Sequence, residues 1–74
     1  MLLSNFVLGQ SGLVKKLNNS LTIKSRLNDL GIVEGTKIKL VRIAPSGDPI
    51  EIKIRDFHLA IRKKEASKIE MERL

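Results

Sequence analysis

The sequence has no cysteine, no tryptophan and no tyrosine, and its only histidine is His58. Without cysteine, neither a disulfide nor a thiolate metal site can stabilise the chain, and one imidazole is too few for a histidine cluster. Phe6 and Phe57 are the only aromatic residues. The chain therefore lacks the aromatic surface that stacks on single-stranded nucleic acid and the aromatic groove that binds proline-rich peptides.

Catalytic groupings are also missing. With a single histidine and no cysteine, we find no serine–histidine or cysteine–histidine arrangement. The glycine pair Gly31 and Gly35 lacks the lysine and helix that follow a phosphate-binding loop. Most of the 8 carboxylates alternate with lysine or arginine along expected strands, whereas acid–base catalysis needs them in a cleft. We therefore expect a protein that is not an enzyme.

No apolar run approaches the roughly 18 residues of a membrane span. Residues 1–8 have no basic region and no small-residue cleavage site, so they make a poor signal peptide. The net charge of +6 favours acidic partners such as nucleic acid, an anionic membrane surface or an acidic protein face, although dispersed charge also serves solubility. We expect a cytoplasmic monomer that meets a membrane only through a partner.

Hydrophobic periodicity predicts about five strands and one short helix. In the segment 50–55, isoleucines alternate with charged residues, as in a strand with one buried face. Proline cannot donate to a strand ladder, whereas glycine accepts a positive φ and aspartate bonds to turn backbone. A hairpin loop is therefore predicted at Pro45, Gly47, Asp48 and Pro49. The expected strands are 13–17, 36–44, 50–55, 57–62 and 69–72, with a short helical turn at 63–67.

Two irregularities are predicted within these elements. The apolar phase of 36–44 changes after Leu40, which indicates a bulge near Leu40 and Val41. Asp56 is expected in a tight turn. Ile23, Leu27 and Leu30 share one helical face, and Gly31 suits the left-handed position that ends a helix.

The predicted fold is mainly β: a small SH3-like barrel, with the helix between strands one and two, as a single domain over residues 1–74. Closing the sheet would remove its exposed edges. Phe57 is in the phase of the core. The expected core residues are Val14, Leu17, Leu27, Leu30, Ile38, Leu40, Ile52, Ile54, Leu59, Ile61 and Ile69.

Three blocks of the sequence resemble the FeoA family. They are 9–14 with Leu17, 26–32 with Gly35, and 41–50 continued by 59–62 and 65–66. The resemblance implies an SH3-like domain, related to the C-terminal module of DtxR-type iron-dependent repressors. It also implies a role in ferrous-iron uptake, with the cytoplasmic part of a FeoB-type transporter as partner. The residues of the family motif, expected to be structural turns, are Gly31, Gly35, Pro45, Gly47, Asp48 and Pro49.

Two other functions stay open beside that of a regulatory adaptor: a basic nucleic-acid-binding barrel and a metal-responsive domain of the repressor type. Nucleic acid is not the expected partner, because the stacking aromatics are missing. No cofactor is expected to bind tightly. A weak divalent transition-metal site at His58 with Glu51 or Asp56 stays open, although an exposed polar role explains His58 as well.

The surface that meets a partner is predicted to be basic with an apolar patch. A basic face speeds encounter with an acidic protein surface, and affinity needs a desolvated anchor. The basic candidates are Arg42, Arg55, Arg62 and Lys63. The apolar candidates are Leu21, Ile32 and Val33 beside the helix; the equally weighted alternative is that these three complete the core.

Overall fold

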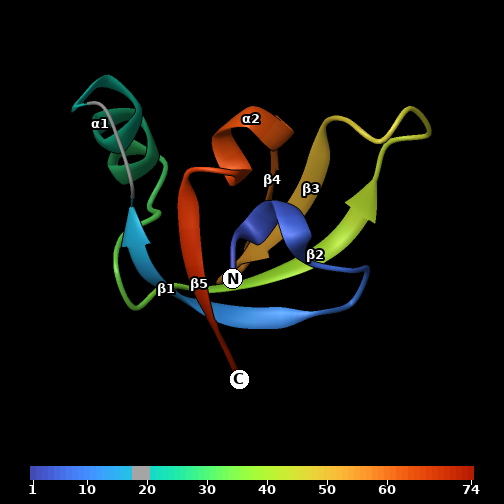
Figure 1. Ribbon diagram of the computed structural model, residues 1–74, viewed down its shortest axis with the longest axis horizontal. Coiled ribbons are helices and arrows are strands. Elements are labelled where there is room, and N and C mark those ends of the chain that lie inside the picture. The colour runs from blue at the N-terminus through green and yellow to red at the C-terminus, as the bar shows by residue number, and fades with distance from the viewer. Residues whose placement is uncertain (18–20) are drawn as a thin grey trace.

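The computed structural model describes residues 1–17 and 21–74, with side chains for all of these except 21–23. A short 3-10 helix, η1 (Leu3–Asn5), precedes the five strands. Helix α1 (Leu21–Asp29) lies between the first two strands, and α2 (Lys63–Ala66) lies between the last two (Figure 1). The strands are β1 (Ser11–Leu17), β2 (Lys37–Ile43), β3 (Ile50–Ile54), β4 (Phe57–Ile61) and β5 (Ile69–Arg73). The predicted mainly β architecture is confirmed.

The strands form one antiparallel sheet in the order β4-β3-β2-β1-β5. The sheet is strongly curved, so that β5 and β3 face each other across the interior with α2 between their upper ends (Figure 1). Among the described strands, the ladder does not close between β4 and β5. The predicted closure of the sheet, with loss of both edges, is therefore not present in the ladder: β4 and β5 are the edge strands, and α2 connects them along the chain.

The two predicted irregularities are both present. Leu40 pairs with Ile52 and Arg42 with Glu51, which leaves Val41 as the extra residue of a bulge. The tight turn between β3 and β4 consists of Arg55 and Asp56, and the positive φ of 53° falls on Arg55.

Helix α1 ends in a Schellman motif. Gly31 has a φ of 90°, its N–H donates to the carbonyl of Asn28, and the N–H of Ile32 donates to the carbonyl of Leu27. In this motif the residue after the glycine packs against the residue three before the cap. Leu27 and Ile32 are both completely buried in the core. The glycine therefore turns the chain so that Ile32 points inward.

Most of the predicted core residues are buried, but Leu30 is half-buried and Leu59 only packs against the core from its edge. The largest omission is the N-terminal segment, which covers the inner face. Its first residue exchanges hydrogen bonds with β5, since the N–H of Met71 donates to the Met1 carbonyl over 2.6 Å. The buried hydrophobic residues absent from the expected core are Leu3, Phe6, Ile50, Ala66 and Met71, and Ile32 takes the core position that was its alternative.

Phe57 is in the phase of the core, as predicted, but it is not buried. Phe57 pairs with Ile54 and so belongs to the inner side of the sheet, yet 44% of it is exposed. Phe57 is the first residue of β4, which is an edge strand, so no further strand lies beside it in the sheet. Its ring lies beside Gly31 at the end of α1.

Candidate partner-binding surface

The outer face of β2 and β3 carries a groove of about 640 Å³. Lys39 and Lys53 lie directly opposite each other in the ladder, so both point to this face. Lys37 lies two residues before Lys39 and so follows the same alternation. Arg55, in the turn directly after β3, lines the groove as well. The remaining lining comes from the loop after α1 and the start of β1: Ser11, Val33, Glu34, Gly35 and Thr36.

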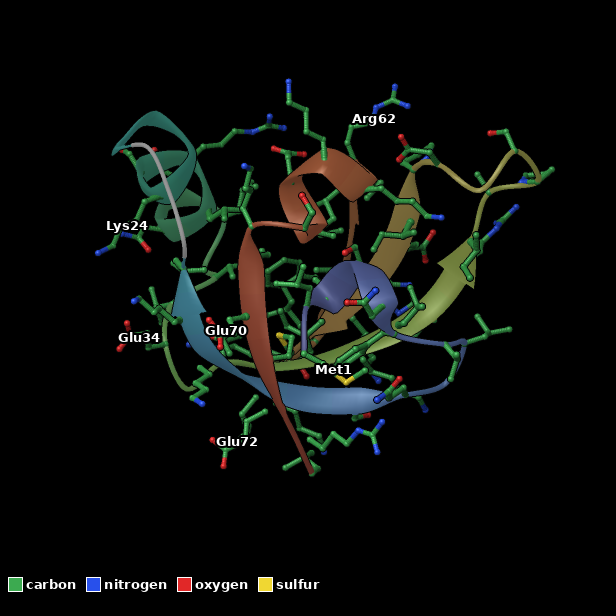
Figure 2. All side chains as sticks on the ribbon, in the orientation of Figure 1. Met1, Lys24, Glu34, Arg62, Glu70 and Glu72 are labelled. Carbon is green, nitrogen blue, oxygen red and sulfur yellow. The ribbon has the colours of Figure 1, made fainter. Side chains whose placement is uncertain are left out.

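The cations lining this groove outnumber its carboxylates among the described residues. Two ion pairs of the chain, Arg26 with Glu65 and His58 with Glu51, include no cation of the groove. The only acidic residue in the lining is Glu34, which projects outward from the loop between α1 and β2 (Figure 2). Like charges directly opposite across a ladder destabilise a sheet. The fold therefore tolerates a repulsion that an anionic partner would relieve.

Val33 is held at the rim of the groove by a rigid turn. Its N–H donates to Thr36 Oγ1 over 3.1 Å, and its carbonyl accepts from the N–H of Thr36 over 3.0 Å. The Thr36 hydroxyl in turn donates to the carbonyl of Gly31. Thr36 is buried, whereas 42% of Val33 is exposed. The turn thus fixes an apolar side chain beside the cations.

The structure separates the three apolar candidates. Val33 is exposed, whereas Ile32 is completely buried, so for Ile32 the equally weighted alternative of a core position holds and a place in a binding surface does not. The Schellman motif explains this, because the chain direction after Gly31 points Ile32 at Leu27. The side chain of Leu21 lies outside the described residues.

The four basic candidates are exposed but do not form one patch. Arg55 lines the large groove. Arg42 lies at the other end of β2, beside a smaller hollow formed with Pro45 and Pro49. Arg62 and Lys63 belong to the start of α2, and Arg62 projects away from the molecule on that side (Figure 2). Lys37 was not among the predicted residues of this surface. The alternation of Lys37 and Lys39 with apolar residues could have indicated that it lies on the same face.

The predicted turn residues lie in two loops, and one of them, Gly35, also lines the groove. Gly31, Gly35 and Gly47 all have positive φ. In the loop between β2 and β3, Asp48 Oδ1 accepts the N–H of Lys63 over 2.9 Å, and the peptide bond between Asp48 and Pro49 is cis. The aspartate thus caps α2 from a distant loop, in addition to any role within its own turn.

His58 lies on the outer face, and its Nδ1 is 2.9 Å from Glu51 Oε2 on the adjacent strand. About half of the His58 side chain is exposed. Within the described ranges 1–17 and 21–74, no three histidine or carboxylate side chains gather to form a metal site. Two ligands from an exposed pair give only weak, carboxylate-assisted coordination. In the same ranges, no helix has the length and apolar character needed to cross a bilayer.

Comparison with known proteins identifies relatives over almost the whole chain. A family model described as the FeoA domain matches residues 1–73. The chain is 31% identical, over 97% of its length, to the "Fe(2+) transport protein A/Fe(2+) transporter FeoB fusion protein" of Porphyromonas gingivalis, of which it spans 8%.

Solved structures give the same result. Iron(II) transport protein A of Clostridium thermocellum is 39% identical with a TM-score of 0.94, covering 100% of this chain and 46% of that one. FeoA of Stenotrophomonas maltophilia, complexed with zinc and described as an SH3 domain protein, is 29% identical with a TM-score of 0.81, covering 97% and 89%. It confirms the predicted SH3-like class.

A manganese-dependent transcriptional repressor in complex with manganese shares the fold alone, at 14% identity and a TM-score of 0.91, over 99% of this chain and 36% of that one. The relation to repressor modules that the sequence motifs imply is therefore confirmed at the level of fold. The match of the family model over residues 1–73, with the identity to FeoA sequences, shows that the chain belongs to the FeoA domain family.

Proposed function

We propose that this chain is a non-enzymatic accessory protein of ferrous-iron uptake that binds the cytoplasmic part of a FeoB-type transporter. The fusion in Porphyromonas gingivalis is the observation that carries the proposal, since a sequence related to 97% of this chain is there joined covalently to the transporter. Covalent linkage raises the effective concentration of two parts for each other. A separate chain needs a binding surface to reach the same association.

The chemistry of the described surface supports binding over catalysis. Its main groove is lined by lysines, an arginine and a valine, with Glu34 as the only carboxylate. General acid–base chemistry needs a positioned group of tuned pKa next to a substrate atom. The His58–Glu51 pair is exposed and lies outside this groove. A binding role at the cytoplasmic side of the membrane, as a monomer, fits these features.

The proposal is tested with the full-length transporter in detergent or nanodiscs. The tagged chain should co-purify with it, and deletion of the chain should lower ferrous-iron uptake by cells. Measuring GTP hydrolysis by the transporter with and without the chain separates a modulator of the GTPase from a scaffold. Absence of association, together with unchanged iron uptake after deletion, would contradict the proposal.

A metal-responsive role is the second candidate, and the zinc complex of the Stenotrophomonas relative is the observation that favours it. In this chain the only imidazole is that of His58, paired with Glu51. Such a pair offers one nitrogen and one carboxylate, so additional ligands would have to come from water or a second molecule. We therefore expect any metal effect to be weak in the isolated chain.

A further inference from the structure

We propose that the groove formed by Lys37, Lys39, Lys53 and Arg55 is the docking site for an acidic polypeptide segment of the partner. The inference deepens the proposed function, and it rests on that function for the identity of the partner as the transporter. The groove and its lining residues are observed in the structure and do not depend on the proposed function. Its test can therefore fail while the association with the transporter holds.

Charge complementarity identifies the occupant as acidic. Four exposed cations face one groove, and the only carboxylate among the lining residues, Glu34, lies on the loop at its end. Glu72 is one further strand away, paired with Leu13, which in turn pairs with Lys37. On the other side, Lys53 pairs in the ladder with His58, whose ring contacts the carboxylate of Glu51. The excess positive charge is thus concentrated over β2 and β3.

The lining favours a polypeptide over a nucleic acid. Single-stranded nucleic acid needs aromatic side chains on which its bases stack. The two phenylalanines of the chain are elsewhere: Phe6 is buried in the core, and Phe57 belongs to the inner side of the sheet. The groove instead offers Val33, an exposed apolar side chain on a rigid turn, which suits an apolar residue within an acidic segment.

The geometry also indicates that the lysines are kept for binding and not for the stability of the fold. Lys39 and Lys53 repel each other from directly opposite positions. Replacing Lys53 by glutamate turns this repulsion into an attraction. The same change removes two units of positive charge from the groove, so it should weaken the binding of an acidic segment without weakening the fold.

The experiment compares two double variants of equal charge change. The groove variant is Lys39→Glu with Lys53→Glu. The control is Lys24→Glu with Lys64→Glu, two exposed residues on α1 and α2; Lys24 projects away from the molecule (Figure 2). Each full chain is titrated against the full-length transporter and against a synthetic peptide of alternating glutamate and leucine. A third titration uses single-stranded DNA of similar charge.

We expect the groove variant to bind the transporter and the peptide at least about tenfold more weakly than the wild-type chain, with the control unchanged. Binding by the wild-type chain should weaken as salt is added, because the attraction is screened. The thermal midpoint of the groove variant should match that of the wild-type chain, because one like-charge pair replaces another, and this excludes a folding defect. The midpoint of the single variant Lys53→Glu should be unchanged or raised.

Two outcomes would overturn the inference. If the control variant loses transporter binding and the groove variant keeps it, docking occurs at the helices. If the DNA binds more tightly than the peptide and the groove variant abolishes that binding, the groove serves nucleic acid. Failure of the wild-type chain to bind the transporter contradicts the proposed function instead, and the peptide titration then tests the groove alone.

Discussion

Arg26 on α1 and Glu65 on α2 connect the two helices, with Arg26 Nη1 2.7 Å from Glu65 Oε2. The other carboxylate oxygen of Glu65 accepts the N–H of Arg62 over 3.2 Å, at the start of α2. The Glu65 side chain is only 11% exposed, against 63% for Arg26. One buried carboxylate thus satisfies a free N–H at the first turn of α2 and attaches that helix to α1.

The two interactions of Glu65 should differ in strength. Glu65→Ala removes the cap together with the ion pair, and we expect it to lower the free energy of unfolding by about 1–2 kcal/mol. Arg26→Ala removes only a contact made by an exposed guanidinium, so the expected loss is below about 1 kcal/mol. Urea denaturation measures both. Equal losses would show that the ion pair, and not the cap, is the main contribution of Glu65.

Gly12 is needed because two groups approach it closely. A Cβ at this position would lie 2.7 Å from the Glu72 carbonyl oxygen and 2.8 Å from Phe6 Cζ. Gly12→Ala should therefore destabilise the protein by about 1–3 kcal/mol, as overpacking does.

The matched control for Gly12 is Gly35→Ala, where nothing lies within 4 Å of the added Cβ and only the positive φ is unfavourable. It should cost about 1 kcal/mol. Thermal denaturation of the two variants checks this order. A smaller loss for Gly12→Ala than for Gly35→Ala would show that Phe6 moves aside easily.

Asp48 connects the loop between β2 and β3 to α2. Asp48→Ala leaves the N–H of Lys63 without its acceptor and should lower the free energy of unfolding by about 0.5–2 kcal/mol. Asp48→Asn keeps an oxygen acceptor and should cost less. Ser46→Ala is a control within the same loop, since the Ser46 hydroxyl donates only to the Asp48 carbonyl. The prediction is contradicted if Asn and Ala substitutions at Asp48 are equally destabilising.

The sequence predicted the strand order along the chain, the bulge at Val41 and the end of α1 at Gly31, because each depends on local periodicity or turn chemistry. It did not predict that the N-terminal segment covers the core. That segment is attached to β5 by hydrogen bonds from the opposite end of the chain, as between Met1 and Met71. No local pattern contains such a contact.

The candidate surface was predicted only in part for a similar reason. A basic outer face followed from alternation. Two of the predicted partner-binding candidates, Arg55 and Val33, are exposed and line the groove, and their role in binding stays a prediction. The pairing of Lys39 with Lys53 depends on the register across the bulge, which a sequence gives only approximately. The burial of Ile32 depends on the Schellman motif. The sequence predicted that Gly31 ends the helix, but it did not predict that the next residue then points into the core.

Metal binding by the isolated chain should be weak. We expect calorimetry with Zn(II) or Fe(II) to give affinities weaker than micromolar, because His58 and Glu51 form a pair and no group of three possible ligands is found among residues 1–17 and 21–74. Glu51→Gln should weaken binding further, and His58→Asn should abolish any specific signal. A sub-micromolar affinity that survives His58→Asn would show that the ligands come from another part of the chain.

Two adjacent residues give the most direct test of where the partner binds. Ile32 is fully buried and Val33 is 42% exposed beside the cationic groove. Ile32→Asp places an unpaired charge in the core and should lower the free energy of unfolding by about 3 kcal/mol or more. Val33→Asp should change it by less than about 0.5 kcal/mol, as an exposed substitution does.

For binding to the transporter, the substitution at Val33 is the informative one, because the protein stays folded. Val33→Asp adds a negative charge at the rim and removes an apolar contact, so affinity for the transporter should fall about tenfold, which corresponds to 1.4 kcal/mol. Val33→Ala leaves the net charge unchanged and should lower the affinity by less. Titrations of folded variants against the full-length transporter decide the matter: unchanged affinity in Val33→Asp would place the interface away from this groove, whereas a large loss of stability would show that Val33 belongs to the core.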